Sequence, residues 1–239
     1  TMKKFILSVM IGFVLLTCAS GTESSEKKLT EKYELTTFNF GDLEFQLPKE
    51  FQITIRNSTK KPSGSYIEKV TVDEYLKLPI YMINEKVSNM VSQGKIVTEK
   101  DLKNLLLQGE SDIILSYFGL SDVWDSYKKF YENNGAIIGE TYFSTGDVPS
   151  YFGYSIGYLY KGVIYRIYLF TNLPEKMKEI YPEIFMEDNG YLFWKHNPNG
   201  KNGRVQAWEL ISSRDKNLPA ELILLQDTYE IFLETVKFK

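Results

Sequence analysis

The stretch from residue 136 to residue 170 constrains the fold more than any other part of the chain. Within it, apolar and aromatic residues stop recurring at helical spacing and alternate with a period of two. Ala136–Phe143, Tyr154–Tyr160 and Val163–Phe170 each predict a strand, and Lys161-Gly162 predicts a hairpin turn between the last two. Aromatic and β-branched side chains suit a half-buried antiparallel sheet, so we expect one here.

Helices are predicted on the N-terminal side of this sheet. Thr71 and Glu74 have the spacing of a capping box, which begins a first helix. Thr98 begins a second helix, and Ser121 caps a third that includes Phe130. Before these helices, the alternating residues on either side of Gly41-Asp42 predict a hairpin, and Tyr66–Val70 predicts a short strand.

The C-terminal third of the chain combines helices with two short strands. Asn172 and Pro174 begin a helix whose inward residues are Met177, Ile180, Tyr181 and Ile184. Tyr191–Trp194 and Val205–Ile211 are predicted to pair as strands, and Pro219 begins a final amphipathic helix. The expected fold is therefore α+β, a single domain over residues 34–239 with a mainly antiparallel sheet and amphipathic helices packed on it.

The first residues have the pattern of an export signal. Lys3 and Lys4 precede the apolar run Phe5–Leu16, and small residues surround Cys18, which is the only cysteine. The apolar run is shorter than the roughly 20 residues that a membrane-spanning helix needs. We therefore expect a signal peptide over residues 1–17 and a flexible polar tether over residues 18–33.

The segment Leu15-Leu16-Thr17-Cys18 resembles the relaxed lipobox of spirochaete lipoproteins, although Leu16 and Thr17 depart from the strict pattern. The resemblance implies that Cys18 carries acyl chains such as palmitate and attaches the domain to a membrane. It also implies an extracytoplasmic location, with Ala19 favouring the outer membrane if the source has two membranes. Ordinary cleavage within Thr17-Cys18-Ala19, which would release a soluble protein, remains an alternative.

The charge balance limits the kinds of partner. The chain has 28 Lys and Arg residues against 31 Asp and Glu residues, and its two signal lysines are its most N-terminal charges. This acidic balance argues against nucleic acid, which requires a basic face. It also argues against electrostatic binding to anionic lipid, so the lipid on Cys18 would have to supply the membrane attachment.

Two segments resemble the PsbP-like domains. The segment Gly41–Phe51 matches their opening pattern of hydrophobic strand, proline and aromatic residue, and the C-terminal helix ending in 232–238 is similar to theirs. The resemblance implies a non-catalytic binding or assembly module. A likeness of fold does not by itself assign a function.

No catalytic motif is recognisable. His196 is the only histidine and lies in a predicted loop, so neither a histidine metal cluster nor a two-histidine relay is expected. The carboxylates and amide of Glu187-Asp188-Asn189-Gly190 suit either a calcium ion or a turn closing the preceding helix, and we favour the turn. No metal or cofactor is implied.

The tyrosines of the predicted sheet are the remaining candidates for a site. Tyrosine combines an apolar ring with a hydroxyl, which suits peptide or sugar recognition, whereas alternating tyrosines in a hairpin also cover a core. The structural role is the favoured interpretation. The possible binding surface consists of Tyr151, Tyr154, Tyr158, Tyr160, Tyr165 and Tyr168.

The sequence thus favours a lipid-anchored protein of the cell envelope that acts by binding an unknown protein or envelope partner and is not an enzyme. Two alternatives remain open. One is a hydrolase of envelope glycans that uses carboxylates alone, and the other is an accessory subunit of a transport or assembly complex.

Overall fold

The computed structural model describes most of the chain outside its first 27 residues. The described residues are 28–55, 64–72, 74, 89–90, 92–95, 98, 100–101, 103–104, 128–133, 136–144, 148–196 and 200–239. The export signal, Cys18, most of the two helices predicted after Thr71 and Thr98, and the helix start predicted at Ser121 lie outside these residues.

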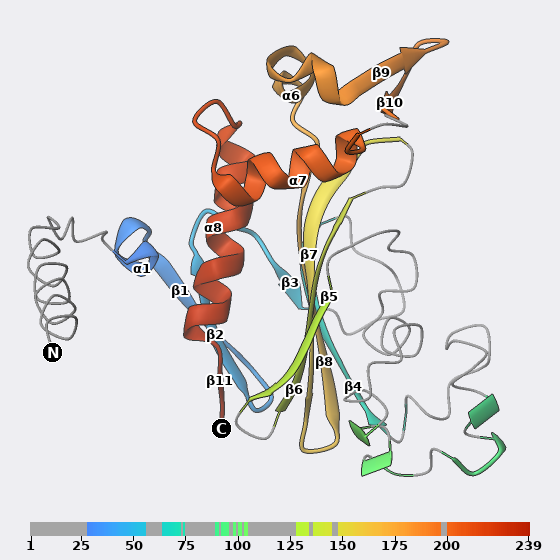
Figure 1. The fold of residues 1–239 in the computed structure, drawn as a ribbon. Helices are drawn as coiled ribbons and strands as arrows, with labels where there is room; N and C mark the ends of the chain where they lie inside the picture. The colour runs from blue at the N-terminus through green and yellow to red at the C-terminus, as the bar shows by residue number, and fades with distance from the viewer. Residues whose placement is uncertain are drawn as a thin grey trace, which may run out of the picture.

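A six-stranded sheet forms the centre of the domain (Figure 1). Neighbouring strands are antiparallel except for the edge pair β3–β4, which is parallel. In spatial order the strands are β3 (Thr54–Ile55), β4 (Tyr66–Thr71), β8 (Val163–Asn172), β7 (Tyr151–Tyr160), β6 (Ala136–Ser144) and β5 (Lys128–Asn133). The predicted strands 66–70, 136–143, 154–160 and 163–170 are all confirmed.

The hairpin of β7 and β8 has the predicted turn. Lys161 and Gly162 both have positive φ, 47° and 74°, and Tyr160 pairs directly with Val163. Two consecutive positive φ values define a type I′ turn, whose twist matches that of the flanking strands. The register places Tyr158 opposite Tyr165 and Ile156 opposite Ile167, so their side chains lie on one face of the sheet.

A second, three-stranded sheet is formed by the two ends of the described chain. It has the order β1 (Leu35–Phe40), β2 (Leu43–Pro48) and β11 (Lys237–Phe238). The predicted Gly41-Asp42 turn joins β1 to β2, and Gly41 has a φ of 64°. The last helix therefore ends earlier than predicted, because its final residues leave the helix and pair with β2.

Helix α8 (Ala220–Thr235) lies between the two sheets, and α7 (Gly203–Ser213) packs beside it over one end of the large sheet (Figure 1). The ring of Phe232 contacts Phe45 of the small sheet at 5.0 Å and Tyr158 of the large sheet at 6.1 Å between centroids. Trp208 of α7 packs edge-on against Phe152 of β7. The two helices thus share one apolar core with both sheets, and the domain is α+β.

The predicted strand over Val205–Ile211 is wrong, because these residues lie in α7. Asn202 caps the helix, since its side-chain oxygen accepts a hydrogen bond from the backbone N–H of Arg204 at 2.9 Å. The predicted partner of that strand, Tyr191–Trp194, is strand β10 and pairs with β9 (Phe185–Asp188) instead. Phe130 also differs from expectation, since it lies in β5 and not in a helix.

The helix predicted after Asn172 is divided in two. It forms α6 (Lys176–Ile180) and the 3₁₀ turn η2 (Pro182–Ile184). Proline disfavours helical backbone in the residue before it, and Tyr181 accordingly has φ −128° and ψ 59°. Met177, Tyr181 and Ile184 are buried as predicted, but Ile180 is exposed.

The predicted capping box at Thr71 is present, and a second capping box occurs at Thr98, where a helix start is predicted. The hydroxyl of Thr71 accepts from the backbone N–H of Glu74 at 3.1 Å, and the Glu74 carboxylate accepts from the N–H of Thr71 at 3.0 Å. Thr98 and Asp101 make the same reciprocal pair, at 3.2 and 3.0 Å. These bonds satisfy backbone donors that a helix start otherwise leaves unpaired.

Residues 28–33, the described part of the predicted tether, also differ from expectation. Leu29–Lys32 form the short helix α1, and Lys32 and Tyr33 contact the side of α8. Residues 29–33 of the predicted tether are therefore packed against the domain.

Candidate functional site

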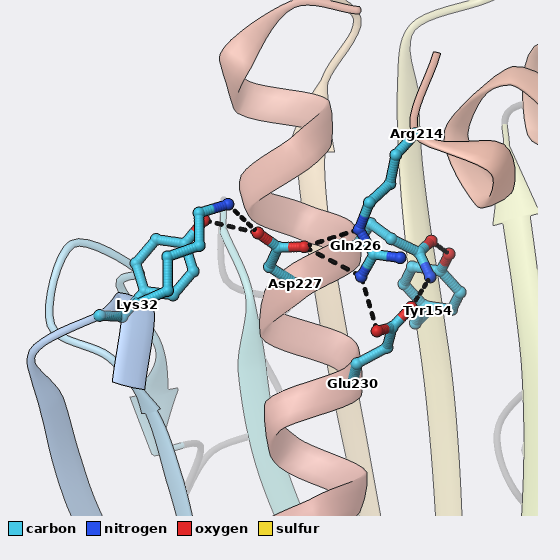
Figure 2. Close-up of polar contacts among 7 residues, drawn as sticks. Lys32, Tyr154, Arg214, Gln226, Asp227 and Glu230 are labelled. Carbon is cyan, nitrogen blue, oxygen red and sulfur yellow. Dashed lines mark hydrogen bonds and ion pairs between the residues drawn. The ribbon is translucent and has the colours of Figure 1, made fainter. Parts of the chain in front are cut away.

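A buried carboxylate on α8 organises the main polar cluster of the described residues (Figure 2). The side chain of Asp227 is fully buried. Its Oδ2 atom accepts hydrogen bonds from Lys32 Nζ at 2.6 Å and from the Tyr33 hydroxyl at 2.7 Å. Its Oδ1 atom accepts a bond from Arg214 Nε at 3.0 Å. Asp227 therefore joins the N-terminal segment and the end of α7 to α8.

Arg214 extends this cluster to a second carboxylate. It occupies the C-cap of α7 with a left-handed φ of 51°, and its Nη2 atom lies 2.6 Å from Glu230 Oε2. Gln226 donates to the other oxygen of Glu230 at 2.6 Å and accepts a hydrogen bond from the Tyr154 hydroxyl. The cluster thus continues from α8 to strand β7 through side-chain hydrogen bonds alone (Figure 2).

The electrostatics of the cluster indicate a structural role. Burial raises the pKa of Asp227, but the hydrogen bonds from Lys32, Tyr33 and Arg214 outweigh burial and hold that pKa below its usual value. A general acid of a glycosidase needs a carboxyl whose pKa is raised, so that it carries a proton near neutral pH. Asp227 therefore does not fit the role of the general acid in such a pair.

The tyrosines predicted as a binding surface do not form one surface. Tyr154, Tyr158 and Tyr165 are buried, so for these three the exposed location is wrong and the core interpretation holds. Their rings pack against α8 and the small sheet: Tyr154 stacks on Tyr229 of α8 at 3.8 Å, and Tyr165 lies edge-on to Phe40 of β1 at 6.2 Å. The residues of a strand that face a helix are buried by that helix. The sequence alone does not show which face of the strand the helix covers.

The other three predicted tyrosines are partly buried and lie apart. The ring of Tyr151 packs at an angle against the ring of Phe170. The ring of Tyr168 stacks on that of Tyr66 with 4.5 Å between centroids. Burial raises the pKa of Tyr168. The hydroxyl of Tyr160 donates to the backbone oxygen of Lys239 at 3.3 Å. None of these three is among the exposed large hydrophobic residues of the described chain.

The candidate calcium ligands Glu187–Gly190 belong to the β9–β10 hairpin and its turn. Asn189 and Gly190 have φ values of 50° and 79°, so they form the type I′ turn between β9 and β10 rather than the end of a helix. Glu187 is paired with Lys178 at 2.6 Å. That ion pair lowers the pKa of Glu187. His196 lies just beyond β10 and is exposed.

The hairpin of β9 and β10, residues 185–194, is the strongest candidate for a functional surface, and we call it the ribbon. It projects from the end of the domain next to α6 (Figure 1). The described chain has five exposed large hydrophobic side chains, and three of them lie in the ribbon or in the adjoining α6. These three are Ile180 (37% exposed), Met186 (44%) and Tyr191 (67%). Such a concentration is typical of an interaction site.

The base of the ribbon is firmly attached to the domain. Phe185 and Trp194 face each other across the two strands and stack at 5.2 Å, and Trp194 packs edge-on against Phe152 at 5.7 Å. The backbone N–H of Lys195 donates to the carbonyl of Ile184 at 3.0 Å. The ribbon is therefore held at one end and exposed at the other.

A shallow, open hollow of about 350 Å³ lies along α7. Its lining is Val205, Trp208, Glu209, Ser212 and Ser213. The one carboxylate in this lining, Glu209, is paired with Lys201. The hollow therefore presents no unpaired charged group that would orient a small ligand.

Comparison of the chain with protein-family models, with curated proteins and with solved structures found no match. Within the part of the chain that the structure describes, no helix has the length and apolar character needed to cross a membrane. The fold defines the protein as a single α+β domain.

Sequence reasoning missed the ribbon as a site, although its signal was present. An Asn-Gly pair between FMED and YLFW is the strongest short-range signal of a hairpin. The same four residues, Glu187–Gly190, also suit ion ligands or the end of a helix, and these interpretations hide the hairpin signal. Asp227 gave no such signal, since two of its three partners, Lys32 and Tyr33, are almost 200 positions away in the sequence.

Proposed function

We propose that this protein is a lipid-anchored module of the cell envelope that acts by binding a protein partner and carries out no reaction of its own. The observation that supports binding is the concentration of exposed apolar side chains on the ribbon and α6. Burying such side chains in a complex is favourable, at about 25 cal/mol per Å² of apolar area. The ribbon replaces the tyrosine hairpin as the proposed contact surface.

The anchor rests on the export signal and on Cys18. Acyl chains bind a bilayer at about 0.8 kcal/mol per buried methylene group, and two chains are needed for stable attachment. A cysteine that carries a diacylglycerol meets that requirement. The anchor would hold the domain at a membrane surface, where the ribbon can contact partners close to that membrane.

Metabolic labelling with palmitate tests the anchor. Wild-type protein is expected to incorporate label and to enter the detergent phase on phase partitioning. Cys18→Ala is expected to lose both properties, whereas Ser20→Ala, a change of similar size two residues away, is expected to keep both. An unlabelled wild-type protein that partitions into water would contradict the anchor and favour a soluble exported protein.

A further inference from the structure

The backbone of the ribbon has unpaired edges. In a two-residue hairpin the residues that flank the turn exchange hydrogen bonds, and bonded and non-bonded pairs then alternate along the strands. Asp188 and Tyr191 flank this turn, so the pair Glu187–Leu192 is non-bonded. The N–H and C=O groups of Glu187 and Leu192 therefore point outward. Among the described residues, no third strand joins this sheet.

One face of the ribbon is apolar and exposed. Met186 pairs with Phe193, and Asp188 pairs with Tyr191, so these four side chains share a face. Met186 and Tyr191 are exposed, and Phe193 is half-buried. The opposite face includes the buried Phe185 and Trp194, which attach the ribbon to the domain.

The surroundings of the ribbon are acidic. Residues 175–195 contain five Asp and Glu side chains and three lysines. One lysine, Lys178, is paired with Glu187. Glu179, Glu183 and Asp188 are exposed carboxylates. A partner that lies along the ribbon is therefore favoured if it carries positive charge.

We propose that the ribbon binds an extended protein segment in which apolar and basic residues alternate, and that this segment adds a third strand to β9–β10. Unpaired backbone groups supply the hydrogen bonds of such an addition. The face of Met186 and Tyr191 contacts the apolar side chains of the segment, and the nearby carboxylates attract its basic ones. This inference rests on the proposed binding function but not on the lipid anchor.

An exposed apolar tip is also compatible with insertion into a bilayer. The acidic side chains around the ribbon disfavour membrane insertion. Cytoplasmic and many bacterial lipid surfaces are anionic and would repel these side chains. Strand addition also uses the free backbone edges, for which lipid provides no partners. We therefore commit to a protein segment and include membrane binding as an outcome of the test.

The test uses the full chain in mild detergent and fluorescent nine-residue peptides. The first peptide alternates valine and lysine, the second alternates valine and glutamate, and the third repeats the first with every backbone amide N-methylated. Fluorescence anisotropy measures each dissociation constant. We expect the lysine peptide to bind at least about tenfold more tightly than the glutamate peptide. N-methylation should abolish binding, because it removes the donors that pair with the ribbon edge.

Two variants locate the site. Met186→Ser combined with Tyr191→Ser is expected to weaken binding of the lysine peptide by at least about tenfold, whereas Ile55→Ser should leave it unchanged. Ile55 is a matched control because it is exposed to a similar extent, 47%, on β3 of the large sheet. Far-ultraviolet circular dichroism checks that each variant is folded. Amide hydrogen exchange should slow at Glu187 if the peptide joins the edge of β9, or at Leu192 if it joins the edge of β10.

Several results would overturn the inference. These are no binding of the lysine peptide at millimolar concentration, equal binding of the N-methylated peptide, or equal losses in the Ile55 and ribbon variants. Binding to anionic vesicles that the ribbon variant abolishes, without peptide binding, would assign the ribbon to the membrane. A peptide that binds but is insensitive to the ribbon variant would keep the binding function and remove the ribbon from it. Palmitate labelling decides the anchor separately.

Discussion

Asp227 illustrates how one buried charge determines the residues around it. Removing a carboxylate from water costs several kcal/mol, and only close and well-oriented partners offset that cost. Lys32 and Arg214 supply two positive charges, and Tyr33 supplies a neutral donor. These partners come from two segments, residues 32–33 and the end of α7, so the carboxylate is satisfied only when both segments pack against α8.

Asp227→Asn is expected to lower the free energy of unfolding by about 3 kcal/mol, because Lys32 and Arg214 lose their shared anion. This value is at the low end for a broken buried pair, since both cations are partly exposed and regain some hydration. Urea denaturation measures it. Tyr33→Phe is the control and removes one hydrogen bond, which is worth about 1 kcal/mol. Equal effects of the two changes would contradict a central role for the charge.

The same carboxylate makes stability depend on pH. An aspartate in an unfolded chain titrates near pH 3.9, to within about a unit, whereas hydrogen bonds from Lys32, Tyr33 and Arg214 hold the folded pKa of Asp227 lower despite the opposing effect of burial. Its contribution is therefore present above the unfolded pKa and is lost as the pH falls through the folded pKa. The difference in unfolding free energy between wild type and Asp227→Asn should accordingly shrink below about pH 4. A constant difference from pH 7 to pH 3 would count against this assignment.

At the scale of elements, the start of α7 positions the ribbon. Gly203 is the first residue of α7, and its backbone N–H donates to the carbonyl of Lys195 at 2.9 Å. A Cβ atom at this position would lie 2.0 Å from the carbonyl oxygen of Ile184. Only glycine allows the helix to approach the base of the ribbon so closely.

Gly203→Ala is therefore expected to destabilise the protein by about 1–3 kcal/mol, which is the usual cost of overpacking. Helix propensity alone predicts the opposite, since alanine is favoured over glycine by about 1 kcal/mol. Thermal denaturation distinguishes the two expectations. Gly64→Ala is the control, because nothing lies within 4 Å of a Cβ atom built there and its φ is not positive. A Gly203→Ala variant that is more stable than the wild type would show that α7 does not approach the carbonyl of Ile184 this closely.

The elements that sequence reasoning predicted correctly are those with strong local signals. The β7–β8 hairpin has strict alternation and a Lys-Gly turn, and α8 has apolar residues at helical spacing over four turns. The strand prediction for Val205–Ile211 is wrong because a short segment rich in apolar residues, VQAWELI, does not by itself distinguish a strand from a helix. The Asn202 cap decides in favour of the helix.

At the scale of the whole molecule, α8 connects the two sheets. Phe232 contacts an aromatic ring of each sheet, Phe45 in β2 and Tyr158 in β7. It is fully buried. The small sheet is formed by residues from both ends of the described chain, so its stability depends on the same contacts.

Phe232→Ala is expected to cost about 3–5 kcal/mol, because a large buried ring leaves a cavity between the sheets. Chemical denaturation followed by near- and far-ultraviolet circular dichroism measures this loss and tests whether both sheets unfold together. Glu234→Ala, an exposed change in the same helix, should alter stability by less than about 0.5 kcal/mol. Two separate transitions in the wild type would contradict a shared core.

The sequence by itself determined the α+β class, the β1–β2 and β7–β8 hairpins, α8 and the capping box of Thr71 and Glu74. Each depends on residues that are close along the chain, through side-chain period, turn residues or caps. Only the tertiary structure decided which tyrosines are buried, which carboxylate gathers Lys32 and Arg214, and that the ribbon projects with Met186 and Tyr191 exposed. These properties depend on which distant segments pack together, and burial is a property of that packing rather than of any local pattern.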